Sequence, residues 1–418
     1  MRPTTETDAE NGWFSGDFMS GAVRQINTLS FFLFKHVSFF MAGIYLHIPF
    51  CKQKCHYCNF FSTASRKQLP HFVDALLNEM DARKEYLNDQ TVDTIYFGGG
   101  TPSMLSHHDL FTIEQKIRSV FTISPDAEIT LEANPDDIST HYLDGLKSTF
   151  VNRLSMGVQS FFADDLTYLN RVHSAKQAIE GIKMVQDAGF DRITIDLIYG
   201  IPTLTDEKWI QNIHTFLETG ITHLSAYALT VESKTALAHL IHKGKLAAVD
   251  EVQSARQFEL LLKMMEENGF SHYEISNFAK PGHYSRHNSI YWLGGHYLGF
   301  GPSAHSFNGY SREWNVSNLG EYIKNSGSNT CVEEKEVLTV VQRFNEYVMT
   351  SLRTSWGCDL EHISNGFGQA YSSYLVKATQ KHIDNEHLIR KGMKFYLTNK
   401  GKLFADGIAS DLFIEECF

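Results

Sequence analysis

The sequence predicts an α/β protein built mainly from parallel strands, with a smaller α+β unit near its C-terminal end. Two observations predict the main part: short apolar runs alternate with segments of helical periodicity, and polar or glycine residues follow each apolar run. Strands that alternate with helices pair in parallel, with the helices outside. Six such units favour an incomplete (β/α)6 barrel, although periodicity alone is equally compatible with an open, doubly wound sheet.

Six apolar runs are predicted as strands, and five segments between them are predicted as helices. The strands are Ile44–Ile48, Thr94–Phe97, Glu128–Glu132, Arg153–Gly157, Arg192–Leu197 and His223–Leu229. The helices are Leu69–Tyr86, His108–Val120, Thr140–Lys147, Ala175–Ala188 and Asp206–Leu217. In both candidate architectures ligands bind at the carboxyl ends of the strands, so the functional residues are expected there.

Length, charge and cysteine usage narrow the class of protein. The chain has 418 residues, enough for two or three domains, and 43% of them are apolar, as is ordinary for a globular protein. A formal charge of −11 argues against nucleic-acid binding, because such domains are usually basic. Three cysteines cluster, and Cys331, Cys358 and Cys417 are scattered. This pattern does not form a disulfide framework, so we expect a cytoplasmic protein.

Residues 1–40 differ from the rest of the chain. They begin with an acidic segment and end in an aromatic run, Phe31 to Phe40, that is too short to span a bilayer. The acidic start and the lack of a small-residue cleavage site argue against a signal peptide. We expect Met41 to be the natural start, with an upstream read-through before it; the alternative is a disordered or surface-docked tail. The sequence predicts no stable membrane span.

A cluster of thiols follows the first strand. Cys51, Cys55 and Cys58 have the spacing C-x3-C-x2-C, so they can converge on one metal centre. Soft sulfur ligands select zinc, copper(I) or iron–sulfur clusters. A structural zinc site needs a fourth ligand, and the nearby candidate, His56, would have to fold back awkwardly. A cubane cluster held by three cysteines leaves one iron open to bind a small molecule.

The same stretch resembles the radical S-adenosylmethionine (SAM) superfamily, whose signature is C-x3-C-x-aromatic-C after a first strand; Tyr57 is the aromatic residue here. The flanking segments 45–51 and 98–102 resemble the oxygen-independent coproporphyrinogen oxidase group. Within that group the oxidases carry a fourth cysteine two positions after the third, and the haem chaperones do not. This chain has Phe60 there. The resemblance runs from about Gly43 to the C-terminus and implies an open barrel, a [4Fe-4S] cluster and SAM.

The resemblance also implies which residues contact SAM. Gly99, Gly100 and Thr101 would receive its methionine end, and Glu132 could accept hydrogen bonds from an ammonium or a ribose. Further positions that match SAM contacts are Tyr45, Tyr57, Gln159, Arg171, Asp196 and Ala228. Three of these have a simpler alternative: the glycines a turn, Glu132 an N-capping or surface carboxylate, and Arg171 a solvated helix residue. No catalytic residue is assigned.

A second cluster, residues 272–306, is dense in aromatic side chains, histidine and glycine and is predicted to be irregular loop. Within it, His287, Asn288, Tyr291 and Trp292 match the H-N-x-x-Y-W pattern associated with the haem chaperones. A neutral imidazole can be an axial ligand of haem iron, and aromatic side chains pack against the macrocycle. The alternative is that His287 and Trp292 pack a loop over the barrel mouth. Together with Phe60, the haem interpretation is favoured.

Residues 326–418 change in character again. Helices are predicted at Val337–Leu352, Asp359–Ile363, Gln369–Ala378 and Gln380–His387, then a strand at Lys394–Thr398, a glycine turn at Asn399–Gly401 and a last helix into Leu412. This order predicts a small winged-helix-like domain, which we expect to serve as a lid or docking domain. The predicted organisation is thus an extension (1–40), a partial barrel (41–235), a barrel-completing region (236–325) and this domain (326–418).

These features predict a haem chaperone that binds haem, a [4Fe-4S] cluster and SAM and passes haem to an acceptor protein. A flavodoxin- or ferredoxin-type electron donor is expected. The alternative is an oxygen-independent coproporphyrinogen III oxidase (dehydrogenase). The missing fourth cysteine weakens it, and so does the absence, from residues 1–40, of the substrate-contacting sequence that the oxidases carry at their N-terminus.

Overall fold

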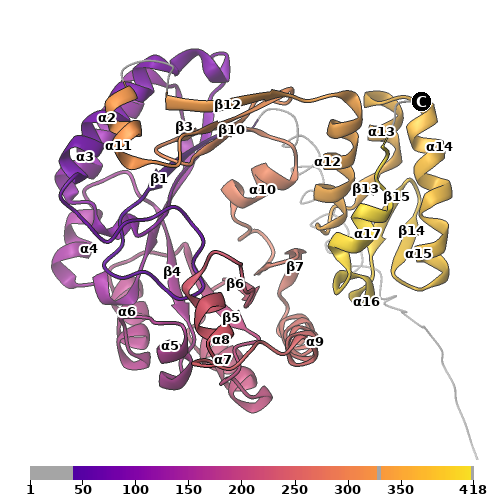
Figure 1. The fold of residues 1–418 in the computed structure, drawn as a ribbon, viewed down its shortest axis with the longest axis horizontal. Helices are drawn as coiled ribbons and strands as arrows, with labels where there is room; N and C mark the ends of the chain where they lie inside the picture. The colour runs from indigo at the N-terminus through magenta and orange to yellow at the C-terminus, as the bar shows by residue number, and fades with distance from the viewer. Residues whose placement is uncertain (1–40, 327–330, 416–418) are drawn as a thin grey trace, which may run out of the picture. The chain divides into compact units, whose positions relative to one another are not determined.

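A curved sheet of twelve strands dominates the computed structural model, which describes residues 41–326 and 331–415 (Figure 1). Its parallel strands are β1 (Ala42–Ile48), β2 (Val92–Gly99), β3 (Ile123–Ala133), β4 (Arg153–Gln159), β5 (Ile193–Tyr199) and β6 (His223–Ala228). They are neighbours in chain order, whereas a doubly wound sheet reverses its order in the middle. β6 pairs onward with β8 and not with β1. The predicted incomplete barrel is therefore confirmed.

Helices cover the convex face of the parallel strands (Figure 1). They are α2 (Leu69–Ala82), α3 (His107–Val120), α4 (Thr140–Leu146), α5 (Ala163–Tyr168), α6 (Ala175–Asp187), α7 (Asp206–Glu218), α8 (Ala236–His242) and α9 (Glu251–Glu267), with short 3-10 turns η1 (Lys84–Leu87), η2 (Pro102–Met104) and η3 (Pro135–Asp137). Capping boxes begin α3 and α6. The five predicted helices are all present, and the first ends at Ala82.

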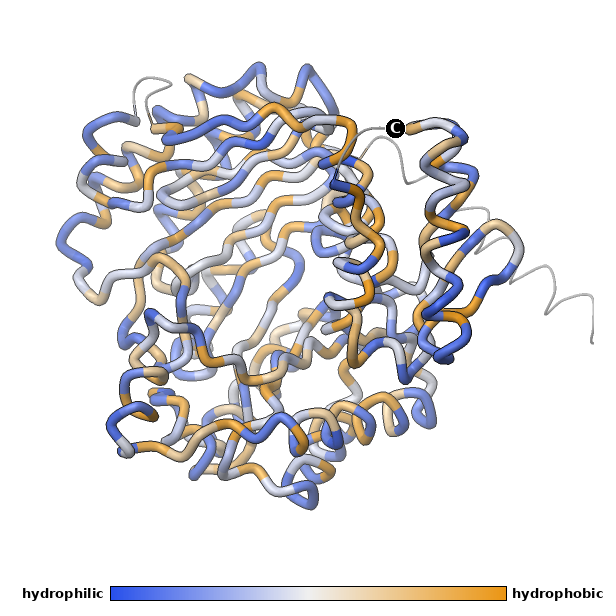
Figure 2. The backbone as a smooth tube through the Cα atoms, turned by 45° about the vertical axis from the view of Figure 1, so that its right-hand side comes forward, coloured by the Kyte–Doolittle hydropathy of each residue, from blue (hydrophilic) through white to orange (hydrophobic). Residues whose placement is uncertain are grey.

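Successive side chains of each parallel strand point to opposite faces of the sheet, and the two faces have different environments. Apolar residues such as Ile95 and Phe97 of β2 are fully buried in the core between sheet and helices. The residues between them, such as Tyr96, face the concave side, which we call the lumen. The lumen-facing positions are mostly polar: Tyr45, Thr94, Tyr96, Glu128, Thr130, Glu132, Arg153, Ser155, Thr194, Asp196, His223 and Ser225. Along the surrounding helices, hydrophilic and hydrophobic segments alternate, as expected for one-sided packing (Figure 2).

The prediction of irregular loop over residues 272–306 is wrong. This region forms β7 (Ser271–Glu274), β8 (Asn277–Ala279), α10 (Arg286–Trp292), β9 (His296–Phe300) and β10 (His305–Phe307). β9 pairs in parallel with β1, and β10, β11 (Ser311–Asn315) and β12 (Val332–Val337) extend the sheet antiparallel, with α11 (Leu319–Asn325) between the last two. These strands are too short for clear alternation, and pairing with the existing sheet decides their structure. β12 lies within the segment predicted as the C-terminal domain but pairs with the large sheet.

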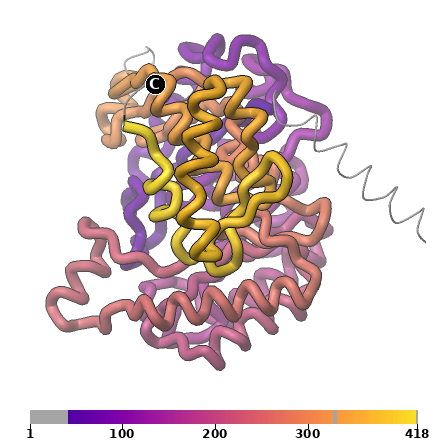
Figure 3. Tube along the Cα trace, turned by 90° about the vertical axis from the view of Figure 1, so that its right-hand side faces the viewer, coloured from indigo at the N-terminus to yellow at the C-terminus, as the bar shows by residue number. Residues whose placement is uncertain are grey.

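Residues beyond Val337 form a helical group around a second sheet (Figure 3). Its elements are α12 (Val340–Leu352), β13 (Cys358–Asp359), α13 (Leu360–Gly366), α14 (Gln369–Ala378), α15 (Gln380–Asp384), β14 (Leu388–Lys391), β15 (Lys394–Leu397), α16 (Asn399–Lys402) and α17 (Ala405–Asp411). The strands pair antiparallel in the order β13-β15-β14, and a separate hydrophobic cluster lies within this group. The predicted α+β character is confirmed, but the expected turn at Asn399–Gly401 is the short helix α16.

The predictions for residues 1–40 and the position of Cys417 lie outside the described residues. Within the ranges that the structure covers, no helix is long and apolar enough to cross a lipid bilayer.

A buried ion-pair network attaches the added strands to the barrel. Arg83 and Glu79, both at most 5% exposed, form an ion pair of 3.0 Å at the C-terminal end of α2, and Arg83 also pairs with Glu313 of β11 at 3.0 Å. The second carboxylate oxygen of Glu79 accepts hydrogen bonds from Gly301 N at 2.9 Å and from Tyr322 Oη at 2.6 Å. Because every charge has a partner, the network can remain ionised inside the protein.

Replacing Arg83 tests this network. We expect Arg83→Met to lower the free energy of unfolding by about 3–5 kcal/mol, because Glu79 is left as a buried charge without a cationic partner, whereas Glu313 keeps its ion pair with Lys335 at 2.9 Å. Urea unfolding followed by circular dichroism measures the change. The matched control is Lys176→Met, which removes the exposed partner of Glu180 on α6 and should change stability by less than ~0.5 kcal/mol. Equal effects of the two substitutions would contradict the prediction.

Candidate functional site

The three clustered thiols lie on a loop that backbone hydrogen bonds hold at several points. Cys51 N donates to Thr63 O at 3.0 Å, and Thr63 N donates back to Pro49 O at 2.7 Å. Farther along, His56 N donates to Leu169 O at 3.1 Å, and Leu237 N donates to His56 O at 2.8 Å. The loop is thus attached to its own base, to the end of α5 and to the start of α8.

The thiols themselves are free and lie close to one another. Cys51 is buried, and Cys55 and Cys58 are half-buried. Burial raises the pKa of both the Cys51 and the Cys58 thiol, and the neighbouring thiol of Cys55 raises each further. In the described part of the chain, no three cysteine, histidine or carboxylate side chains are placed to hold a single metal ion.

His56, the candidate fourth zinc ligand, helps to hold the cysteine loop through one of its ring nitrogens. Its Nδ1 lies 2.9 Å from Tyr168 O, so the ring faces a backbone carbonyl of α5 and holds the loop in place. The tentative fourth ligand is therefore an anchor of the loop in this structure.

Arg171 connects the cysteine loop to two strand ends. Its Nη1 lies 3.3 Å from Cys55 Sγ, and its Nη2 donates to Asn134 Oδ1 at 2.5 Å and to Gly157 O at 2.7 Å. Asn134 in turn donates to Thr101 Oγ1 at 3.3 Å. The guanidinium fork is therefore fixed by the ends of β3 and β4, and it is not the solvated arginine of the simpler interpretation.

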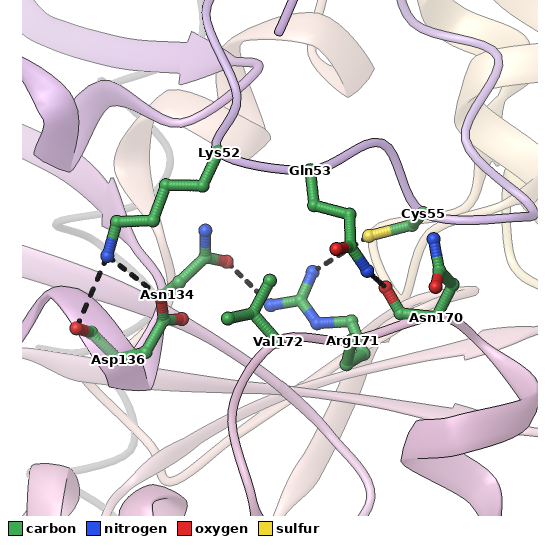
Figure 4. A pocket seen from close by; sticks show the side chains of 8 residues that line it. All are labelled: Lys52, Gln53, Cys55, Asn134, Asp136, Asn170, Arg171 and Val172. Carbon is green, nitrogen blue, oxygen red and sulfur yellow. Dashed lines mark hydrogen bonds and ion pairs between the residues drawn. The ribbon is translucent and has the colours of Figure 1, made fainter.

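A surface depression lies beside this arginine (Figure 4). The residues that line it are Lys52, Gln53, Cys55, Asn134, Asp136, Asn170, Arg171 and Val172. Figure 4 shows Lys52 reaching from the cysteine loop to Asp136, at 2.8 Å, while Gln53 Nε2 donates to Asn170 O at 3.1 Å. Both sides of the cysteine loop are thereby pinned to neighbouring loops.

The glycine segment after β2 packs directly against the base of the cysteine loop. A Cβ on Gly100 would come within 2.7 Å of Phe50 O, and one on Gly99, whose φ is +103°, would meet the ring of His47 at 2.6 Å. A Cβ on Gly98 would lie 2.8 Å from the ring of Tyr96. These contacts require glycine for close packing, independent of any ligand.

Two lumen carboxylates, Glu132 and Asp196, are held by neighbouring hydroxyls. Tyr96 Oη donates to Glu132 Oε1 at 2.8 Å, and Ser155 Oγ donates to Asp196 at 3.2 Å. Burial, together with the negative charge of Asp196, raises the pKa of Glu132 from 4.5 to about 7, although the hydrogen bond from Tyr96 opposes this shift. Burial likewise raises the pKa of Asp196 to about 6. Two enclosed carboxylates near one another form a site for a positively charged or hydroxyl-bearing ligand.

The other residues predicted to contact SAM differ in their burial and in their position around the lumen. Tyr45 lies beside Tyr96, with ring centroids 6.2 Å apart, and Tyr57 is half-buried among the thiols and Arg171. Gln159 has the rare positive φ of 68° at the end of β4. Ala228 ends β6 and is exposed.

Tyr96 was missed by the sequence analysis, although it holds Glu132. The signal that could have found it is the alternation along β2, where Thr94 and Tyr96 interrupt an otherwise apolar strand.

The helix α10, which carries the H-N-x-x-Y-W residues, lies within the concave side of the sheet (Figure 1). His287 is 1% exposed, and its Nδ1 and Nε2 are hydrogen-bonded to Thr94 Oγ1 at 2.7 Å and to Tyr291 Oη at 2.9 Å. Asn288 N donates to the cap Ser285 Oγ at 3.3 Å. Trp292 packs under the guanidinium of Arg353, 5.3 Å from the ring centroid. As haem contacts, these residues stay a prediction.

The chain is similar to known proteins in both its sequence and its fold. The family model of the radical SAM superfamily matches residues 45–216. The chain is 34% identical over 376 residues to the "Heme chaperone HemW" of Mycobacterium tuberculosis (strain CDC 1551 / Oshkosh), covering 88% of this chain and 94% of that protein. The chain belongs to the HemW family of radical SAM proteins. To the HemW of Bacillus subtilis (strain 168) it is 34% identical over 372 residues, covering 88% and 98%.

A solved structure described as coproporphyrinogen III oxidase (HemN) from Escherichia coli superposes with a TM-score of 0.79, covering 92% of this chain and 93% of that one. At 23% identity this likeness shows the shared fold. Family membership implies a [4Fe-4S] cluster and SAM as cofactors. The three free thiols and the enclosed carboxylates fit these groups: Cys51, Cys55 and Cys58 would hold the cluster, and Glu132 and Asp196 would face SAM.

The raised pKa of Glu132 predicts how the stability of the ligand-free protein depends on pH. Its usual pKa is 4.5, so between pH 4.5 and about 7 the folded protein binds a proton that the unfolded chain has lost. The stability contributed by the neutral carboxyl is therefore lost as the pH rises through this window. We expect Glu132→Gln, which stays neutral, to gain stability relative to the wild type between pH 5 and pH 8. Melting temperatures of the cluster-free proteins measure this, and parallel pH profiles would contradict it.

Proposed function

We propose that the chain is a haem chaperone, which binds haem, a [4Fe-4S] cluster and SAM and transfers haem to an acceptor protein. The observation that carries the proposal is Phe60. It occupies the position where the related oxidases have a fourth cysteine, next to a complete set of three cluster ligands, and its side chain is 61% exposed. Relatives of this chain that are about one-third identical over most of its length are named haem chaperones.

The chain's own residues would prepare the cofactor site. When bound and reduced by an electron donor, the cluster would provide the electron for reductive cleavage of SAM. Arg171 fixes the loop of the cluster ligands against the ends of β3 and β4, as its contacts to Asn134 and Gly157 indicate. Glu132 and Asp196, both half-buried, would accept hydrogen bonds from SAM.

The alternative, an oxygen-independent coproporphyrinogen III oxidase, shares this fold and the three-cysteine loop. The residue at position 60 does not support it, because the oxidases have a cysteine there and this chain has Phe60. Apart from the three loop cysteines, no described cysteine lies near this part of the loop to replace the fourth thiol. Cys331 and Cys358 are buried elsewhere, the first beside Glu79 and the second in the C-terminal hydrophobic cluster. The likeness to the oxidase structure supports only the fold.

The two functions make different predictions for anaerobically reconstituted protein. We expect iron and sulfide in the preparation, a Soret band on titration with haem, and turnover of coproporphyrinogen III with SAM and reductant far below ~1 per second, a rate typical of working enzymes. Metal analysis, absorbance titration and product chromatography measure the three.

The controls use the cysteines. Cys58→Ala should lose iron and sulfide, whereas Cys358→Ala, which removes a buried thiol outside the loop, should keep them. Zinc in place of iron would contradict the cluster assignment, and turnover at ~1 per second or faster would contradict the chaperone function.

The electron donor is proposed to dock beside the cysteine loop. Residues 51–68 carry four basic side chains and no acidic one, in a chain whose formal charge is −11. Of these, Lys52 is paired with Asp136 and Asp137, and Lys54, Arg66 and Lys67 are exposed. A basic surface over a redox centre attracts an acidic flavodoxin- or ferredoxin-type protein.

Charge reversal tests the docking surface. We expect Lys54→Glu combined with Lys67→Glu to slow reduction of the cluster by reduced flavodoxin at least about fivefold at low salt, because electrostatic steering is lost, with a smaller difference at high salt. Stopped-flow absorbance measures the rate. Lys183→Glu combined with Lys263→Glu is the matched control, because it also reverses two exposed lysines, near the C-terminal ends of α6 and α9. If the control slows reduction as much as the double variant, this surface is not the docking site.

A further inference from the structure

The imidazole of His287 occupies a closed position below the cofactor site. Its ring is stacked on Tyr96, with centroids 4.9 Å apart and 23° between the planes, and both of its nitrogens have hydroxyl partners. A Cβ added to Gly43 of β1 would lie 3.3 Å from His287 Cε1, so the strand also packs against the ring edge. Iron could bind this imidazole only after one of the two hydrogen bonds breaks and α10 moves away.

The backbone of α10 is fixed to the lumen as firmly as the ring. His287 N donates to Glu128 Oε1 at 3.0 Å, and Glu128 is also paired with Arg153 at 3.7 Å. Arg286 forms ion pairs with Asp93 at 3.5 Å and with Asp126 at 3.4 Å. The helix is therefore attached to residues of β2 and β3 toward their amino ends, the end opposite to the cysteine loop.

From this position His287 connects to the residues expected to hold SAM. Thr94, Tyr96 and Gly98 are successive lumen-facing residues of β2, so Thr94 lies about 13 Å below Gly98 along the strand. His287 contacts the lower two of these residues. Tyr96 then donates its hydroxyl hydrogen to Glu132, and the rings of Tyr96 and Tyr45 form the surface against which Gly98 packs.

We propose that His287 is a positioning residue for the SAM site, acting through Tyr96 on Glu132 and the glycine segment, and that it is not the axial ligand of haem iron. In this role the imidazole bridges the Thr94 and Tyr291 hydroxyls and presents its face to the Tyr96 ring. A neutral imidazole with one donor and one acceptor nitrogen matches two hydroxyls, each of which can donate or accept. The inference rests on the proposed SAM site but not on haem binding.

Three variants separate the two roles. His287→Phe keeps an aromatic ring on Tyr96 but cannot bind iron. Thr94→Val has the shape of the original residue and keeps the imidazole intact, but removes the Nδ1 partner. Ser289→Ala is the matched control, since it removes a buried hydroxyl of the same helix, which donates to the carbonyl of the cap residue Ser285 at 2.7 Å.

Reconstituted holoprotein of each variant is titrated with SAM by calorimetry and with haem by absorbance, and its melting temperature is recorded. We expect SAM to bind about three- to tenfold more weakly to both His287→Phe and Thr94→Val, the loss typical of a buried hydrogen bond. The shift of the reduced cluster's electron paramagnetic resonance signal on SAM addition should need correspondingly more SAM. Ser289→Ala should stay within twofold of the wild type, and haem affinity and the Soret maximum should be unchanged in all three.

Two results would overturn the inference. One is a Soret shift with at least tenfold weaker haem binding in His287→Phe, while SAM affinity stays within twofold. The other is an unchanged SAM affinity in Thr94→Val, which decides the matter even if His287→Phe folds poorly. Wild-type protein that binds SAM but no haem would overturn the chaperone function alone, and the Thr94→Val result would still support the role of His287. Wild-type protein that binds no SAM would overturn the inference together with the cofactor site.

Discussion

The two faces of the parallel sheet differ in what covers them, and the rest of the structure depends on this difference. Helices bury the convex face, and the free energy of that apolar burial holds the barrel together. The concave face cannot be covered in the same way, because the barrel is open and the next strand on from β6 turns back antiparallel. Most of its side chains are polar, and many of them form hydrogen bonds with one another. The proposed cofactor site lies at the upper end of this polar layer.

The closure of the lumen explains why α10 is a helix on the inside of the sheet. Arg153 and Glu128 are each about 96% buried or more, and an open lumen would leave them facing water on one side. α10 supplies a backbone N–H to Glu128 and an imidazole to Thr94, so polar groups deep in the barrel gain partners without water. The same helix meets the C-terminal group through Trp292 and Arg353. The C-terminal group thus contacts the element that closes the lumen.

Sequence patterns predicted the parts of the fold that are periodic. The six parallel strands and five helices alternate long enough for apolar periodicity to show, and the residues that follow each strand lie at one end as expected. The spacing of the thiols marked the cysteine loop, whereas Arg171 and the two carboxylates were expected only from the family resemblance; as cofactor contacts all of them stay predictions. Periodicity could not predict β7 to β10, since strands of three to five residues carry no clear alternation and their pairing partners are far away in the chain.

The predicted haem residues show that one sequence motif can correspond to two different arrangements of its side chains. The letters H-N-x-x-Y-W indicate a histidine beside aromatic residues, which is equally the composition of an axial-ligand loop and of a packed helix. What distinguishes them is whether the imidazole nitrogens have partners, and this depends on Thr94, which lies 193 residues earlier in the chain. In the folded protein, Thr94 of β2 forms a hydrogen bond with an imidazole nitrogen of His287 that could otherwise bind a metal. The motif can then be required for function without touching haem, because an imidazole in this place sets the position of Tyr96, and Tyr96 sets the orientation of the carboxylate above it.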